Sequence, residues 1–100
     1  MPAMSLSVPH KLGKDEATVR MQKLMARLKE KYGDQYKELE ETWSEDAVQF
    51  AFSSYGMKIK GDLLIGEEAV DLQGEIPFAA MMFKGRIEKE VRETLERFLS

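Results

Sequence analysis

Apolar residues alternate with polar ones in five short segments of the chain. Alternation with a period of two is typical of strands that bury one face. The first predicted strand covers residues 4–8, and a less regular one, whose start is not clear, lies within residues 34–44. Three more follow at even spacing with turn residues between them, at residues 47–52, 57–65 and 69–76.

Two other segments carry apolar residues at spacings of three and four, which place them along one side of a helix. The first predicted helix runs from about residue 14 to residue 32. Gly33 suits its C-terminus, because glycine can adopt a positive φ without a Cβ clash. The second predicted helix runs from about residue 78 to residue 99, after Pro77 has ended the last strand.

The order of the predicted elements is β-α-β-β-β-β-α, in a single domain of residues 1–100. The simplest arrangement is an α+β fold of two layers, in which a twisted antiparallel sheet of about five strands carries both helices on its apolar face. The first strand must join this sheet after a helical crossover. The pattern does not determine which edge it joins.

The composition indicates which classes of partner and which cell compartment to expect. The formal net charge is −3, and charged residues of both signs are interspersed, which argues against a nucleic-acid partner. The chain has no cysteine, which excludes disulfides and thiolate chemistry. No signal-peptide pattern is visible, and no apolar run approaches the roughly 18 residues of a membrane span. We therefore expect a cytoplasmic protein without a membrane span.

Residues with reactive or metal-binding side chains do not form a recognisable set of catalytic groups, so we predict no catalytic, metal or cofactor site. His10 is the only histidine, and its neighbours Pro9 and Lys11 offer neither the partner nor the polarising group that a general base needs. We expect it to be a loop histidine that bonds to the backbone. A hydrolase in which folding brings a carboxylate to His10 is an alternative.

Some apolar residues do not fit the buried stripes. Leu64 falls on the polar face of its strand. Met81 and Met82 are adjacent on the second predicted helix and cannot both point inward, and Phe78 lies near them at the helix start. Clustered exposed apolar groups mark partner surfaces. These residues therefore predict an interaction patch, for a homodimer or for adsorption to a hydrophobic body.

Several segments, taken in order, resemble the polyhydroxyalkanoic acid system family of small bacterial proteins. They are VPHKLGKDEA at residues 8–17, LKEKYG at residues 28–33, the strand that contains Trp43, YGMKIKGDLLIG at residues 55–66 and KGRIEKEVRETL at residues 84–95. His10 and Trp43 match family positions, and each has a structural explanation, as a loop anchor and a core aromatic. The resemblance implies an association with the machinery that makes, coats or degrades intracellular polyester granules, and it implies no activity.

Two functions are compatible with this resemblance. The first is a non-enzymatic accessory protein that binds the granule surface or a granule-associated protein. The alternative is a small protein that binds an apolar acyl ligand in a pocket between the sheet and the C-terminal helix. Neither function requires a cofactor.

Overall fold

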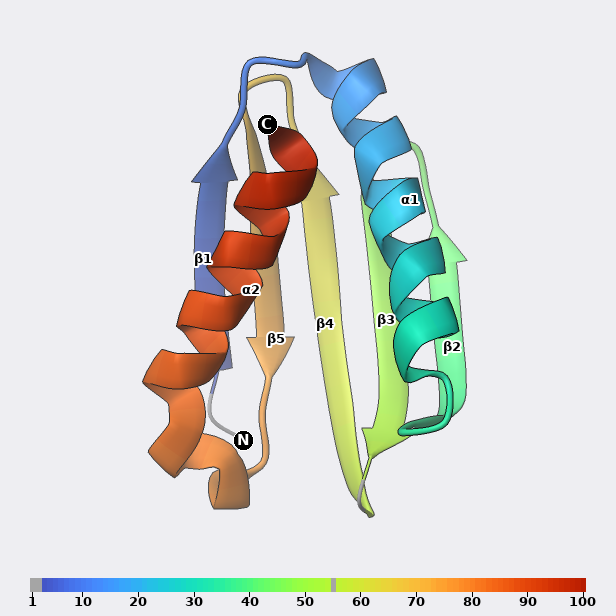
Figure 1. Cartoon of the computed structure of the whole chain (residues 1–100), viewed down its shortest axis with the longest axis vertical. Coiled ribbons are helices and arrows are strands. Elements are labelled where there is room, and N and C mark those ends of the chain that lie inside the picture. Colours follow the sequence, from blue (N-terminus) through green and yellow to red (C-terminus); the bar gives the residue numbers. More distant parts are fainter. Residues whose placement is uncertain (1–2, 55) are drawn as a thin grey trace.

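The structure is a computed structural model that describes residues 3–54 and 56–100. The residues outside this description are Met1, Pro2 and Tyr55. Tyr55 is the first residue of the segment 55–66, one of those that resemble the family. Figure 1 shows a five-stranded antiparallel sheet with both long helices on one face, as the sequence predicted. The elements are β1 (Ala3–Pro9), α1 (Lys14–Tyr32), β2 (Lys37–Trp43), β3 (Ala47–Ser54), β4 (Met57–Ile65), β5 (Ala69–Glu75), η1 (Phe78–Phe83) and α2 (Lys84–Leu99).

The strand order is β1-β5-β4-β3-β2, so the first strand of the chain lies beside the last one. β2 to β5 form a meander of antiparallel neighbours. β1 pairs with β5 at one edge of the sheet, and α1 then carries the chain across to β2 at the other edge. The register places residues of like character opposite each other, such as Leu6 with Leu72 and Val8 with Val70. Matched apolar pairs across strands fix which face is buried, because a slip of one residue would expose them.

α1 has the predicted bounds, but it ends differently from the prediction. Gly33 has a φ of −56°, in the right-handed region, so the positive φ expected there is wrong. A Cβ atom at this position would lie 2.6 Å from the carbonyl oxygen of Lys29. The lack of a side chain at Gly33 therefore permits a close approach to the preceding turn.

The second helical region is not one continuous helix. Residues 78–83 form the separate 3-10 segment η1, and the α-helix begins only at Lys84. The break lies at Phe83, whose φ and ψ of −106° and 8° are not those of an α-helix. Phe83 lies four residues before Ile87, at the spacing of the buried side of α2, yet it is 54% exposed. No residue of η1 is buried, so no core contact holds this segment in line with α2.

The hydrophobic core lies between the sheet and the facing halves of the two helices. α1 covers the β2–β3 side of the sheet and α2 covers the β1–β5 side, while the helices converge toward the end that holds the start of α1 and the end of α2 (Figure 1). The buried side chains come from both helices and from β1, β3, β4 and β5. They are Met4, Leu6, Val8, Ala17, Met21, Leu24, Val48, Leu63, Ile65, Val70, Leu72, Leu95 and Leu99.

Candidate functional site

His10 is buried at the end of β1 and is fully engaged with backbone atoms. Its Nε2 lies 3.0 Å from the carbonyl oxygen of Gly66, and its Nδ1 accepts a hydrogen bond of 3.2 Å from the amide of Leu12. Both bonds are satisfied by a neutral ring that carries its proton on Nε2. The backbone amide of His10 also donates to the carbonyl of Glu68, at 2.8 Å. His10 thus joins the loop before α1 to the β4–β5 turn, the anchoring role expected for it.

Trp43 lies on the helix-facing side of β2 and packs against the core as a partly buried aromatic. Its indole nitrogen donates to Oε1 of Glu41 at 2.5 Å, and Lys29 of α1 lies 2.5 Å from Oε2 of the same carboxylate. Burial raises the pKa of Glu41, but the bonds from Lys29 and Trp43 outweigh it, so the pKa lies below its ordinary value. This trio fastens α1 to the edge strand β2.

The residues of the predicted interaction patch are all exposed, but they do not form one surface. Phe78, Met81 and Met82 lie together in η1, with exposed fractions of 76%, 42% and 89%, and Phe83 adds to them. Leu64 is 46% exposed on the face of the sheet that carries no helix, where it pairs with Ala47 and Asp71. Leu64 is next to the last residue of β4, and β4 ends at the opposite end of the sheet from η1 (Figure 1).

An apolar groove of about 550 Å³ runs between the two helices, over the middle of the sheet. The helices diverge away from the end where they meet, and the groove lies between them there (Figure 1). Pro77 and Ala80 line it beside η1, so the groove and the exposed segment adjoin. Its main apolar side chains are Leu24, Met25, Leu28, Tyr32, Tyr36, Leu39, Phe50, Phe52, Met57, Ile59, Ile76, Ile87 and Val91.

Two glycines lower the floor of this groove. Gly61 of β4 and Gly74 of β5 are paired across the strands and face the helices. The ring of Phe50 lies across Gly61, so closely that a Cβ atom there would come within 2.4 Å of the ring. Gly61 therefore leaves the space that the ring of Phe50 occupies.

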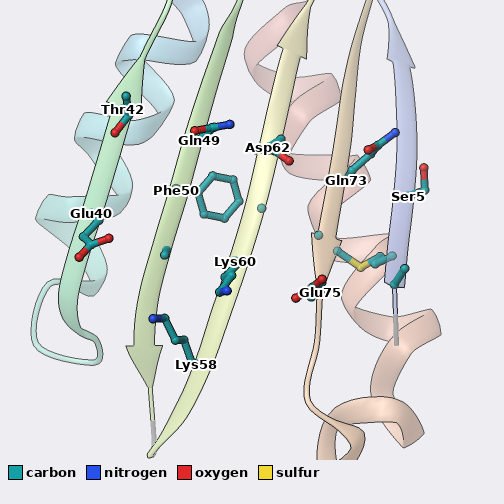
Figure 2. Close-up of a pocket in the computed structure, with 15 residues that line it drawn as sticks. Ser5, Glu40, Thr42, Gln49, Phe50, Lys58, Lys60, Asp62, Gln73 and Glu75 are labelled. Carbon is teal, nitrogen blue, oxygen red and sulfur yellow. The ribbon is translucent and has the colours of Figure 1, made fainter. Parts of the chain in front are cut away.

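The opposite face of the sheet carries a polar hollow of about 750 Å³. Figure 2 shows polar side chains along the five strands, and the register aligns them in one row: Thr42, Gln49, Asp62, Gln73 and Ser5. Glu40, Lys58, Lys60 and Glu75 flank this row. Such amide, hydroxyl and charged groups offer hydrogen bonds to water or to a polar ligand. Met4, Phe50 and Ala51 also line the hollow, so its lining is polar only in part.

Within residues 3–54 and 56–100, no group of three or more His, Asp or Glu side chains is placed to hold a metal ion. No helix of the same residues is long and apolar enough to cross a membrane.

The sequence did not distinguish the groove from the core. Met25 and Tyr32 fall on the same helical stripe as buried Met21 and Leu24, and their period is that of core residues. The glycines within two neighbouring strands, at positions 61 and 74, were the available signal, because glycine inside a strand often marks a close approach. Their pairing becomes visible only with the strand order.

Comparison with known proteins identifies one family. The model of the family described as "Putative polyhydroxyalkanoic acid system protein" matches residues 4–99. This match spans nearly the whole chain, from β1 to the end of α2. No curated protein matches the chain.

Proposed function

Because the chain belongs to the polyhydroxyalkanoic acid system family, we propose that it is a non-enzymatic, cytoplasmic accessory protein of polyester storage granules. It contacts the granule through η1. The observation that carries this proposal is the exposure of η1, an apolar segment in which Phe78 and Met82 are 76% and 89% exposed. Exposed apolar clusters of this kind favour contact with another apolar surface.

The position of η1 favours contact with a flat surface over insertion into a deep pocket of another protein. The segment lies at one end of the molecule, beyond the helix-covered part of the sheet (Figure 1). Each apolar side chain that leaves water at such a contact contributes about 1.5–3 kcal/mol when it is fully buried. Several such side chains suffice for adsorption to a polyester surface.

The test is flotation of the purified protein with polyhydroxyalkanoate particles on a density gradient. We expect Met82→Asp to reduce the particle-bound fraction about tenfold or more, because an aspartate at the contact would have to be desolvated. Leu64→Asp is the matched control: it adds the same charge at an exposed apolar residue on the other face, and we expect no change.

Three outcomes separate the alternatives. If Met82→Asp floats like the wild type, adsorption through η1 is wrong. If the substitution instead splits a dimer in sedimentation, with adsorption unchanged, η1 joins two copies of the chain. If the protein floats only when granule proteins are present, the partner is a protein.

The apolar groove favours a second candidate function, the binding of an apolar acyl ligand. Its volume of about 550 Å³ falls within the range of roughly 300–1,000 Å³ that is typical of ligand sites. Its walls come from α1 as well as from α2, so the pocket differs from one formed by the sheet and the C-terminal helix alone. Native mass spectrometry of the purified protein tests this function, since a bound acyl compound would add its mass to that of the chain.

A further inference from the structure

The two edges of the sheet differ in how they are protected against pairing with another chain. β2, with the sequence KELEETW, has four charged residues, a register shift between Lys37 and Glu40, and a φ of 57° at Glu38. Charges and bulges of this kind keep an edge strand from pairing with another chain. β1 has seven residues, none of them charged, and pairs with β5 without a shift. The β1 edge therefore lacks the features that protect β2.

Backbone groups of β1 point outward along this edge. The amide of His10 donates to the carbonyl of Glu68 at 2.8 Å, and such bonding alternates along an antiparallel pair of strands. Every second residue back from His10 therefore bonds to β5. The residues between them, Ala3, Ser5 and Ser7, turn their amides and carbonyls away from the sheet.

Arg92 of α2 bonds to this edge. Its Nη1 donates to the carbonyl oxygen of Ser7 at 3.0 Å, as expected for a carbonyl that points away from β5. Among residues 3–54 and 56–100, no other side chain bonds to the outward groups of β1. Because Pro9 has no amide, the stretch that can pair through both groups runs from Ala3 to Ser7 and is centred on Ser5.

We propose that the β1 edges of two copies of this chain pair antiparallel about a two-fold axis at Ser5, which joins two five-stranded sheets into one. Ser5 pairs with Ser5 of the other copy, and Ala3 pairs with Ser7 on either side, so every outward amide of this stretch is bonded. The Ser7 carbonyl can accept this bond beside that of Arg92, because it has two lone pairs. On the helix-covered face, buried Met4 then lies opposite Leu6 of the other copy, an apolar match that fixes the register.

The outer side of α2 supports the same two-fold arrangement. Four residues at spacings of four, with charges of alternating sign, lie on one side of this helix: Lys84, Glu88, Arg92 and Glu96. The bond from Arg92 to Ser7 shows that this side is turned toward the free edge of β1. The two-fold axis sets α2 antiparallel to its counterpart, so Glu88 lies opposite Arg92, and the two ends of the row also meet with opposite charges. The row is complementary to itself in this direction.

The strand pairing and the charged row can share one axis. β1 and α2 run in the same direction (Figure 1), and the bond between Arg92 and Ser7 fixes their relative height. The middle of the charged row lies about 3 Å before Arg92 along α2, and Ser5 lies about 7 Å before Ser7 along β1. A long arginine side chain reaches over a difference of this size.

The first experiment is sedimentation equilibrium of the full chain over a series of concentrations, with Ser5→Pro as the test variant. Proline removes an amide that the monomer does not use, so the fold should be kept while the central bonds of the dimer are lost. We expect the dimer to weaken about a hundredfold or more. Ser5→Ala keeps the amide and is the matched control, for which we expect a dimer like that of the wild type.

The second experiment exchanges charges on α2. Glu88→Arg alone and Arg92→Glu alone place like charges opposite each other, and each should weaken the dimer about tenfold or more. An equal mixture of the two variants restores opposite charges at both contacts, so it should form a mixed dimer about as tight as that of the wild type. Arg86→Glu makes the same charge change beside Glu90, which lines the groove on another side of α2, and should leave the dimer unchanged.

The outcomes decide between this edge and other contacts. If the wild type stays monomeric up to about 1 mM, or if Ser5→Pro forms a dimer as tight as the wild type does, the proposal is wrong. Failure of the mixed charge variants to associate would refute the antiparallel placement of α2. Met82→Asp should leave the dimer intact, because η1 lies at the end of the sheet and not along the β1 edge (Figure 1). Adsorption through η1 and pairing through β1 can therefore fail independently.

Discussion

The two ends of the helix–sheet sandwich are built from the same elements but are held together differently. At the closed end, where α1 begins and α2 ends, buried side chains fill the space and polar bonds link elements that are distant in sequence. His10 binds the β4–β5 turn, Arg20 binds the end of α2, and Lys14 forms an ion pair with Asp46.

At the open end, groove side chains such as Met25, Phe52 and Met57 are only partly buried, and most of η1 is exposed. The apolar surface left there contributes little to stability, because it stays in contact with water. The difference indicates that one end of the molecule maintains the fold while the other is available for an apolar partner. Substitutions at the two ends should therefore have opposite effects on stability and on binding.

The largest expected effect comes from Met21, which is fully buried at the closed end. Met21→Ala should lower the free energy of unfolding by about 2–5 kcal/mol, because it leaves a cavity in a packed core. Met25→Ala, one turn along the same helix, removes an equal side chain from the groove wall and should cost about 1 kcal/mol or less. Denaturation in urea measures both, and equal losses would refute the contrast between the ends.

The next effect concerns the polar links of the closed end. His10→Ala removes the partner of the Gly66 carbonyl and of the Leu12 amide and should lower the free energy of unfolding by about 1–3 kcal/mol. Lys11→Ala, at the exposed neighbouring position, should stay within about 0.5 kcal/mol of the wild type. A wild-type stability for His10→Ala would show that this link is dispensable.

A smaller effect depends on pH and involves the Lys29–Glu41 pair, which joins the last turn of α1 to β2. Because the pKa of Glu41 is lowered on folding, its contribution is present above its ordinary pKa of 4.5 and is lost as pH falls through the folded-state value. Lys29→Met should therefore destabilise the fold at pH 7 by on the order of 1 kcal/mol, and progressively less below pH 4.5.

Lys31→Met is the control for this pair, because Lys31 belongs to the same last turn of α1 and has no carboxylate partner among the described residues. It should show no such pH dependence. Unfolding in urea across a series of pH values measures both variants. A cost for Lys29→Met that is constant from neutral pH to well below 4.5 would contradict the assignment.

The smallest effect on stability is expected from the exposed apolar residues. Met82→Asp and Leu64→Asp should each change the free energy of unfolding by no more than about 0.5 kcal/mol, because both side chains face water. Thermal unfolding checks this. A large loss for Met82→Asp would mean that η1 supports the fold, and its exposure would then say little about a partner.

The elements of the fold were largely predictable from the chain. Alternation identified the strand of residues 57–65 and helical spacing the helix of residues 14–32, and both have these bounds in the structure. The break at Phe83 was not predictable, because an apolar run such as residues 78–83 fits any helical stripe. The backbone of the structure shows that it is separate from α2, since residues 78–83 form a 3-10 segment and Phe83 leaves the helical conformation.

The candidate site was predictable in part. The exposure of Leu64 and Met82 followed from their misfit to the apolar pattern, but their separation depends on the strand order and on the direction of each strand. The groove was hidden because its residues share the period of the core.

The place of β1 also determines the order in which the chain can fold. The meander of β2 to β5 forms from neighbouring segments, whereas Pro9 must find Ala69 and Ala3 must find Glu75. Long-range pairing is slow, because loop closure must come first. Until β1 docks, the edge of β5 stays unpaired, and an open strand edge invites pairing with another chain. During synthesis, β1 leaves the ribosome before β5 and must therefore wait for it before this sheet is complete.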